Sequence, residues 1–255
     1  MMVKLGDADA MIGGATRRYS YRGELSRVKN ILGLQAGLKD AAALEMLVMP
    51  NRGAYFFTDT MVAKDPDAKT LAATAVLASD AVARYEIQPR VAMLSHTNFG
   101  SDEGTGAKVA EATQMVKEMA PYLEVDGEMQ PSAALDEAVR ESLLLESSLT
   151  GNANVLVLPN LDAATISCNL VKELSNGMQV GPISLGLNGS VQLVASSITT
   201  RGLLNMTAVA AVEAHAFQSM AEVCDGGLES VECSQHTHTD WNSGEWKSVD
   251  ELVGN

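Results

Sequence analysis

The sequence has few cysteines, few aromatic side chains and few positive charges. Its 255 residues include 3 Cys and 2 Trp, and aromatic residues make up only 4% of the chain. A small, odd number of cysteines offers no disulfide framework and is typical of a reducing compartment, so we expect a cytoplasmic protein. With 18 Lys and Arg against 32 Asp and Glu, the net charge of −14 argues against nucleic acid or an anionic membrane as the main partner.

Long hydrophobic runs are also missing. A transmembrane helix needs about 18 or more apolar residues in succession, and the sequence has no such stretch. The opening residues, Met1–Asp7, lack the apolar segment of a secretory signal. What the chain does have is length and aliphatic side chains, with 46% hydrophobic residues and 13 Met. This is enough for one large domain or two small ones with an aliphatic core.

Acidic charge is concentrated at the C-terminus. Residues 221–255 hold eight acidic side chains against one lysine, Lys247, which leaves −7, half of the net charge. Gly and Ser interrupt this segment and its hydrophobic periodicity is poor. We therefore predict a domain over residues 1–220 and an acidic tail over residues 221–255.

Short apolar runs alternate with helical periods in the remainder of the chain. Asp65-Pro66-Asp67 is typical of a helix start, and Ala163, Ile166, Leu170 and Leu174 form an apolar stripe that predicts another helix. Alternation of this kind indicates an α/β fold with a mainly parallel sheet covered on both faces. The expected strands are Ala8–Gly14, Leu44–Pro50, Ala54–Thr58, Arg90–Ser95, Ala153–Pro159 and Val191–Ala195, and further helices are expected over Ala68–Tyr85, Ala107–Ala120 and Thr200–Met220.

The loop after the expected strand Arg90–Ser95 is the most suggestive place for a ligand. Loops at the carboxyl ends of parallel strands form the sites of open α/β sheets. Here Ser95–Ser101, followed by Gly104 and Gly106, offers hydroxyls and accessible backbone N–H groups for an anion. An ordinary Gly- and Ser-rich connection is the alternative interpretation. The sequence has neither a GxxxxGK[ST] loop nor a GxGxxG motif, so the usual nucleotide and nicotinamide sites are not supported.

Other candidate residues are weaker. Asp59 and Thr60 follow a strand, where an Asp serves either a ligand or a turn. His96 is a candidate general base or a solvated loop residue, and Cys168 fits a small core residue. Four zinc-type side chains lie near the C-terminus, but their spacing matches no common zinc site, so we expect no metal. They are Cys224, Cys233, His236 and His238.

Five ordered stretches resemble one family. They are Met1–Met11, Phe57–Thr60, Pro89–Ser95 with Asn98–Ser101, Glu124–Gln130 and Ala153–Ala164. Together they resemble the phosphate acetyl/butyryl transferase (phosphotransacetylase) family from Met1 to about Met220. The chain is most similar to the phosphotransacetylase-like C-terminal domain of bacterial NADP-dependent malic enzymes, for which Asn98–Ser101 and Leu203–Met206 are typical.

This resemblance implies an αβα three-layer sandwich with two subdomains, a cleft for coenzyme A thioesters and a homo-oligomer. It also implies a set of ligand-binding positions in that cleft. These are Asp59, Thr60, Ser95, Thr97, Gly100, Ser101, Asn160, Ser196, Ser197 and Thr199.

The sequence departs from the family pattern in two ways. Active phosphotransacetylases carry a Ser-Arg-Gly stretch and then an Asp before the last long helix, whereas this chain has Ala195-Ser196-Ser197 and Gly202. Loss of the arginine removes charge stabilisation from the phosphoryl group, and loss of the base lowers the rate, so no residue is expected to be catalytic. The chain also opens well inside the family's domain, and we expect it to lack the first elements of the fold.

The leading expectation is an acetyl-CoA-binding regulatory or oligomerisation domain of an NADP-dependent malic enzyme, an oxidoreductase whose catalytic domain lies outside this chain. One alternative is an active phosphate acetyltransferase, which converts acetyl-CoA and phosphate to acetyl phosphate and CoA. A truncated oligomerisation module is the other. We expect no covalently bound cofactor, with acetyl-CoA, another acyl-CoA or acetyl phosphate as the ligand. The malic-enzyme catalytic domain is the expected protein partner.

Overall fold

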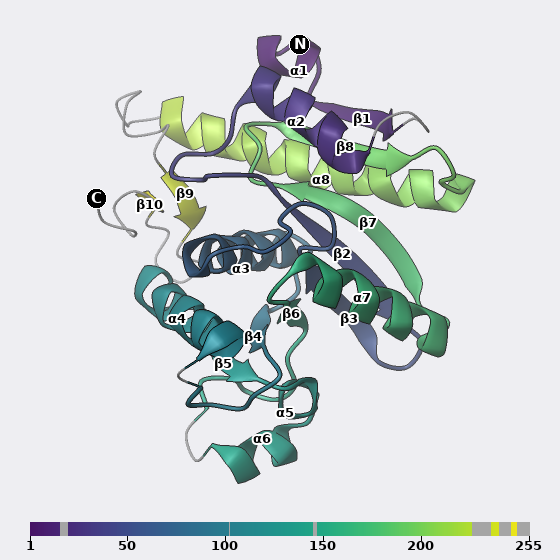
Figure 1. The fold of residues 1–255 in the computed structure, drawn as a ribbon. Coiled ribbons are helices and arrows are strands. Elements are labelled where there is room, and N and C mark those ends of the chain that lie inside the picture. The colour runs from purple at the N-terminus through teal and green to yellow at the C-terminus, as the bar shows by residue number, and fades with distance from the viewer. Residues whose placement is uncertain (16–19, 102, 145–146, 226–235, 240–245, 249–255) are drawn as a thin grey trace. The chain divides into compact units, whose positions relative to one another are not determined.

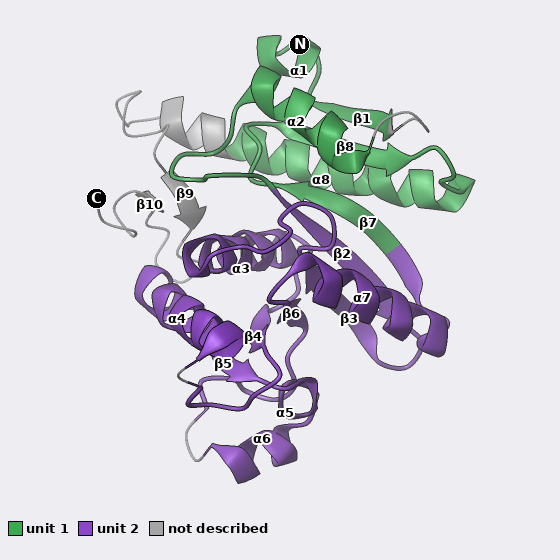
Figure 2. Ribbon diagram, viewed as in Figure 1, with its two compact units in different colours: residues 1–41, 180–255 green, residues 42–179 purple. Residues whose placement is uncertain are grey.

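The computed structural model describes residues 1–15, 20–101, 103–144, 147–225, 236–239 and 246–248 (Figure 1). The chain forms two compact units (Figure 2). Unit 1 comprises residues 1–41 and 180–255, and unit 2 comprises residues 42–179.

Unit 2 is built on a mostly parallel sheet. Its strands lie in the order β5-β4-β6-β3-β2, with parallel pairing from β5 through β3 and one antiparallel hairpin, β2–β3, in which Leu44 pairs with Thr58. Such strands are buried on both faces and read as continuous apolar runs. The strands are β2 (Ala42–Met49), β3 (Gly53–Thr58), β4 (Arg90–Leu94), β5 (Glu124–Met129) and β6 (Val155–Val157).

Helices cover both faces of this sheet. Phe56 of β3 stacks on Tyr85 just after α3, with ring centroids 6.3 Å apart, whereas the next residue, Phe57, packs in a cluster with Cys168 of α7. Because successive strand residues point to opposite faces, α3 and α7 lie on opposite sides of the sheet. The helices of this unit are α3 (Ala68–Ala83), α4 (Gly104–Met119), α5 (Pro131–Leu135), α6 (Glu137–Leu143) and α7 (Leu161–Ser175). The observed mixed α/β fold with a mostly parallel sheet confirms the predicted fold class.

Helix α3 begins as its sequence predicts, although the cap is the second of the two aspartates. Asp67 is the N-cap and accepts a hydrogen bond from the backbone N–H of Thr70 at 2.8 Å. Twelve of its sixteen residues are buried, so the helix is covered on most of its circumference.

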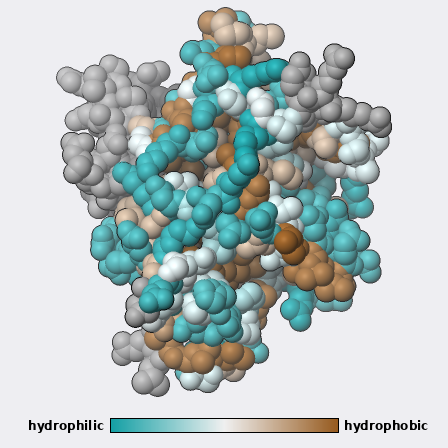
Figure 3. All heavy atoms as spheres, viewed as in Figure 1, coloured by the Kyte–Doolittle hydropathy of each residue, from teal (hydrophilic) through white to brown (hydrophobic). Residues whose placement is uncertain are grey.

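The apolar stripe of α7 marks the helix correctly, but most of it does not face the core, although Ala163 packs against the core. The buried side of α7 is formed by Ala164 and Cys168. Ile166, Leu170 and Leu174 are 66%, 56% and 78% exposed, and apolar side chains gather over α7 in the space-filling view (Figure 3). Small residues let the helix approach the sheet closely, so the larger apolar side chains are left on the outside.

A buried arginine organises the loop between α6 and β6. Arg140 is 1% exposed and its guanidinium donates to three carbonyl oxygens, those of Ala133 (3.1 Å), Leu149 (3.2 Å) and Gly151 (2.7 Å). Its Nε also donates to the Ser147 hydroxyl at 3.0 Å. Burial of this charge is compensated by hydrogen bonds to backbone oxygens.

Unit 1 combines the two ends of the chain around a two-stranded parallel sheet. Strands β1 and β8 pair in register from Ala10 with Ser190 to Ala15 with Ala195, and α2 and α8 pack on them. The elements are α1 (Met2–Leu5), β1 (Ala10–Ala15), α2 (Tyr21–Leu32), β7 (Met178–Leu185, which begins in unit 2), β8 (Ser190–Ala195) and α8 (Thr200–Asp225).

Helix α8 continues past the domain boundary predicted at residue 220, to Asp225. Within the predicted tail, β9 (His236–Thr239) and β10 (Trp246–Ser248) form an antiparallel pair, and most of the remaining tail lies outside the described residues. In the described part of the chain, no helix is long and apolar enough to span a membrane.

Candidate functional site

Two loops at the carboxyl edge of the unit 2 sheet are joined by hydrogen bonds. The loop after β3 and the loop after β6 meet where Leu161 N–H donates to the Lys64 carbonyl oxygen at 3.1 Å and the Thr165 hydroxyl donates to the Thr60 carbonyl oxygen at 3.1 Å. Strands β3, β6 and β4 are neighbours and parallel, so the loop after β4 lies at this edge as well. The three loops therefore lie at one edge of the sheet.

Asp59 is buried at this edge and fixes the loop after β3 by hydrogen bonds. Its carboxylate accepts hydrogen bonds from the backbone N–H groups of Ala43, Met61, Val62 and Ala63, at 2.7–3.4 Å, and the residue is only 7% exposed. Burial raises the pKa of Asp59, although the four N–H donors act in the opposite direction. Both carboxylate oxygens are used by the protein, which is the turn role considered from the sequence. Thr60 is also buried, so the ligand roles predicted for these two residues remain predictions.

The Ser95–Ser101 loop is anchored to the end of β5. Backbone N–H groups of Phe99 and Ser101 donate to the carbonyl oxygen and to Oε1 of Glu128, both at 2.9 Å. Gln130 completes the attachment, since its backbone N–H donates to Asn98 Oδ1 at 2.8 Å and its side chain donates to the His96 carbonyl oxygen at 2.7 Å. Glu128 is itself 1% exposed, so the loop rests on a buried support.

Two features of the backbone shape this loop. Phe99 and Gly100 have positive φ values of 46° and 97°, a conformation that favours glycine and turns the chain sharply. Gly106, in the first turn of α4, allows the helix to approach the loop. A Cβ there would lie 2.5 Å from Ser101 Cβ and 2.7 Å from Thr97 Oγ1, closer than atoms pack.

Hydroxyl groups and a histidine gather at the start of the loop. Ser95 Oγ lies 3.4 Å from His96 Nδ1 and 3.3 Å from Thr97 Oγ1, distances at the long end for hydrogen bonds. These groups are therefore close enough to contact one ligand atom together, and they form only weak hydrogen bonds with one another. They offer donors for an anionic or carbonyl oxygen.

Asn160 and an unpredicted lysine lie at the neighbouring loop. Asn160 caps α7 by accepting from the Ala163 N–H at 2.9 Å, so its predicted ligand role competes with a capping role. Lys108 of α4 donates to the Pro159 carbonyl oxygen at 3.1 Å and pairs with Asp65 at 2.6 Å. The N-termini of α4 and α7 thus both lie at the carboxyl edge. Lys108 was missed because nothing in its local sequence marks a lysine that reaches another loop.

The other three predicted site residues, Ser196, Ser197 and Thr199, lie in unit 1, and all three are exposed. Thr199 caps α8 by accepting from the Gly202 N–H at 3.0 Å, and Ile198 N–H donates to the Ala195 carbonyl oxygen at 3.1 Å. This loop is therefore held by bonds to its own neighbours in sequence. The seven remaining predicted residues all lie in unit 2.

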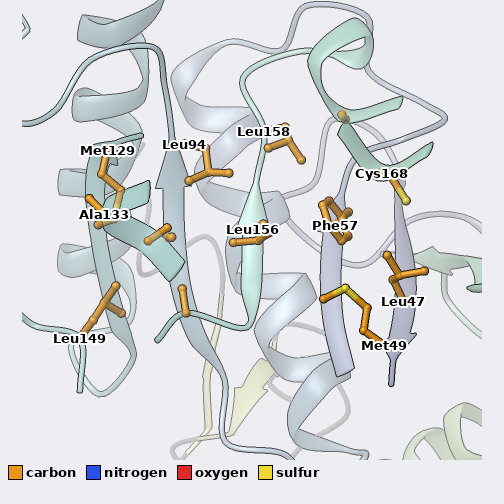
Figure 4. Packing of buried hydrophobic residues seen from close by; sticks show 14 residues of the cluster. Leu47, Met49, Phe57, Leu94, Met129, Ala133, Leu149, Leu156, Leu158 and Cys168 are labelled. Carbon is orange, nitrogen blue, oxygen red and sulfur yellow. The ribbon is translucent and has the colours of Figure 1, made fainter. Parts of the chain in front are cut away.

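A cavity of about 700 Å³ adjoins the site within unit 2. Ser95 and His96 line it at the carboxyl edge, and apolar side chains line most of the rest. Figure 4 shows Phe57, Leu94 and Leu156 on one face of the strands, between Ala133 of α5 and Cys168 of α7. No local sequence pattern predicts this cavity, because its wall comes from elements far apart in the chain.

A buried carboxyl group lies under α7. Glu45 of β2 is 1% exposed, and neither oxygen has a hydrogen bond of good geometry among the described residues. Burial raises the pKa of Glu45 to about 7, although Gln179 and Lys172 lower it in part. Burial and the charge of Glu45 raise the pKa of Cys168 to about 12, so this thiol is inert. Its interpretation as a core residue is confirmed.

Among the described residues, no three His, Cys, Asp or Glu side chains are grouped so as to hold a metal ion. Of the C-terminal zinc-type residues, Cys233 lies outside the described residues, and the side chains of Cys224, His236 and His238 do as well.

Comparison with known proteins identifies the family to which the chain is similar. Residues 1–211 match the model of the phosphate acetyl/butaryl transferase family. The chain is 45% identical over 214 residues to an NAD-dependent malic enzyme of Rhizobium meliloti and 43% identical over 216 residues to an NADP-dependent malic enzyme of Escherichia coli. In both cases 84% of this chain is covered, but only 27% and 28% of the relative. The chain thus spans about a quarter of the length of these malic enzymes.

Among solved structures, the EutD phosphotransacetylase from Staphylococcus aureus superimposes with a TM-score of 0.77 at 27% identity. The match covers 84% of this chain and 65% of that protein. The sequence motifs, the mostly parallel sheet and the site loops at its carboxyl edge agree with these matches. The chain therefore belongs to the phosphate acetyl/butaryl transferase family.

Proposed function

We propose that the chain is an acetyl-CoA-binding regulatory and oligomerisation domain that works with an NADP-dependent malic enzyme and has no transferase activity of its own. Support comes from the malic enzymes that are 43–45% identical to it. A cytoplasmic location fits the small number of cysteines.

The site at the carboxyl edge of unit 2 has the chemistry to hold an acyl thioester. The hydroxyls of Ser95 and Thr97 can donate to the thioester oxygen, and the positive-φ turn at Gly100 lets a ligand approach the backbone. The N-termini of α4 and α7 favour negative charge, such as a phosphate of CoA. Binding of a polyanion by this acidic chain therefore depends on local donors and not on net charge.

One observation carries the proposal that transfer does not occur. The loop after β8 presents the hydroxyl of Ser196 where the family resemblance implies an arginine, and Gly202 occupies the position of the expected aspartate. Ser196 is exposed and lies in a turn, so this loop supplies neither a guanidinium for a phosphoryl group nor a carboxylate for the CoA thiol. The negative charge of the phosphoryl group in the transition state would then have no guanidinium to stabilise it.

Calorimetric titration with acetyl-CoA, followed by a thiol-release assay with phosphate or arsenate, tests this function. We expect saturable binding and no release of CoA, under conditions in which a known phosphate acetyltransferase releases it. Gly100→Ala should weaken binding about tenfold, because alanine disfavours a φ of 97°.

Gly151→Ala is the matched control. Gly151 also has positive φ, 73°, and open space around it, so its replacement costs similar backbone strain without touching the site. Equal loss of binding in both variants, or absence of binding in a folded sample, would remove the proposal.

An active phosphate acetyltransferase is the second candidate, favoured by the likeness to EutD phosphotransacetylase and by the closeness of Ser95 Oγ to His96 Nδ1. Phosphate-dependent release of CoA in the same assay would select it.

Self-association is the third part of the proposal, and it rests on the exposed stripe of α7. We expect the chain to form a homo-oligomer in which Ile166 is covered, because exposed apolar stripes of this kind mark interaction surfaces. Light scattering should show Ile166→Asp as a smaller species than the unmodified chain, whereas Asn169→Asp, on the adjacent side of the helix, should not change the mass. A monomeric unmodified chain would contradict this expectation.

A further inference from the structure

We propose that the cavity of unit 2 is a site for an acyl chain longer than acetyl, so that the domain prefers medium-chain acyl-CoA. This inference rests on the proposed acyl-CoA site and names its substrate class. The cavity measures about 700 Å³, within the range of about 300–1,000 Å³ that is usual for small-molecule sites.

The floor and walls of the cavity are aliphatic and aromatic. Phe57 from β3, Leu94 from β4 and Leu156 from β6 form the floor, as Figure 4 shows. Leu135 of α5 and Val171 of α7 also line the cavity, as do Leu170 and Leu174 of the exposed stripe. These side chains come from five separate elements that enclose a concave apolar surface. An aliphatic ligand gains free energy by leaving water for such a surface.

Polar groups define which way a ligand would lie. Ser95, His96 and Thr105 line the cavity at the carboxyl edge of the sheet, while Tyr55 and Arg52 line it near the β2–β3 hairpin, at the opposite ends of the strands. The thioester carbonyl therefore belongs beside Ser95, where the hydroxyls gather, and the acyl chain extends along the strands toward the hairpin. From Tyr55 to Thr58 the strand alone spans roughly 10 Å, which exceeds what an acetyl group fills.

Affinity should depend on chain length if the cavity takes the acyl group. Each methylene buried against apolar side chains strengthens binding by up to about fourfold. We therefore expect dissociation constants measured by calorimetry to fall steadily from acetyl-CoA through butyryl-CoA and hexanoyl-CoA to octanoyl-CoA, by at least tenfold in total.

A filling variant sharpens the test. Ser167 lines the cavity from α7, so Ser167→Phe should occupy part of the space and reduce the difference between octanoyl-CoA and acetyl-CoA from tenfold or more to under threefold. Asn169→Phe is the matched control, because Asn169 is exposed on the same helix and does not line the cavity. This control should retain the full chain-length dependence.

The possible failures are distinguishable. Equal affinity for all four thioesters would overturn the acyl-chain site and leave the proposed function standing, whereas no binding of any acyl-CoA would overturn both. If affinity is flat and Ser167→Phe instead changes the mass measured by light scattering, the cavity belongs to an interface between copies of the chain and the acyl-chain site is wrong.

Discussion

The loops Ser95–Ser101 and Ser196–Thr199, which the family resemblance assigns to one ligand site, are held in contrasting ways. The first is fixed by hydrogen bonds that Glu128 accepts and Gln130 donates, and both residues are about thirty positions away along the chain. The second is held by bonds to residues within three positions of it and is exposed. A ligand would thus find the first loop already ordered, whereas the second has few contacts that oppose rearrangement.

The two loops also differ in how closely they pack against the helices that follow them. Each helix has glycine as its third residue, Gly106 in α4 and Gly202 in α8. At Gly106 an added Cβ would meet Ser101 and Thr97, which belong to the anchored loop. At Gly202 it would meet Ile198 Cγ1 at 2.9 Å and Thr199 Oγ1 at 3.2 Å, both from the second loop. The first loop is thus packed more tightly against its helix than the second.

Removal of the anchor should have the largest effect. In Glu128→Ala the Ser101 N–H loses its acceptor and a buried space opens, so the free energy of unfolding should fall by about 3–4 kcal/mol. Urea denaturation would measure this fall. Glu128→Gln is the control, because it keeps an oxygen acceptor for Ser101, and it should lose less than half as much. An unchanged free energy in Glu128→Ala would show that the first loop is no better anchored than the second.

The unit that carries the anchored loop should also respond to pH through Glu45. Its carboxyl group has a pKa near 7 when folded and about 4.3 when unfolded, so the folded state favours the protonated form. The contribution of Glu45 to the free energy of unfolding should therefore be fully present below about pH 4.3. This contribution should fall by about 2–3 kcal/mol as the pH rises to 7.

Glu45→Gln should remove that fall in denaturation curves measured between pH 5 and 8. If the variant keeps the same pH dependence, another group is responsible. Acetyl-CoA affinity measured between pH 5 and 8 would then show whether the Ser95–Ser101 loop responds to pH independently of Glu45 under α7.

The glycines test the comparison directly. We expect Gly106→Ala to destabilise the fold by about 1–3 kcal/mol because the loop must move away. Gly202→Ala should cost less, about 0.5–1 kcal/mol, because only Ile198 and Thr199 of an exposed loop have to shift. Gly23→Ala, at the third position of α2 with its nearest atom 3.4 Å away, should be neutral or slightly stabilising. Thermal unfolding of the three variants would rank them, and a reversed order would mean that the loops do not differ in packing.

A charge added to the second loop should have the smallest effect. Ser196→Arg places a guanidinium in an exposed turn, so any added attraction to the phosphates of CoA is weak and screened by salt. We expect acetyl-CoA affinity at low salt to rise no more than about fivefold, and thiol release to stay absent because Gly202 supplies no base. Release of CoA would show that the arginine alone restores transfer.

Much of the fold could be predicted from local patterns. The buried apolar runs around Leu156 and Phe57 are strands, as expected, because parallel strands covered on both faces need apolar side chains throughout. Strand β5 was not predicted, since Glu124, Asp126 and Glu128 interrupt its apolar pattern. Their carboxylates accept hydrogen bonds from neighbouring loops, which local sequence does not reveal.

The site was predictable only in outline. The Ser95–Ser101 loop was found from its hydroxyls and glycines, but its support at Glu128 depends on strand order. Periodicity identified α7 and not its orientation, because an apolar stripe fits an exposed face as well as a core. Packing of the smaller Ala164 and Cys168 decided the outcome.

Arg140 has a consequence for how the protein can vary. Three of the atoms that it binds are carbonyl oxygens, of Ala133, Leu149 and Gly151, and every amino acid carries that oxygen. Substitutions of exposed side chains in the loop before β6 should therefore leave these bonds intact, whereas the buried Leu149 and Ala153 and the positive φ of Gly151 restrict the composition there. Insertions or deletions there should not be tolerated, because they would move the oxygens away from a guanidinium that has no water to replace them. The arginine thus constrains the length of this loop, and burial at Leu149 constrains its composition.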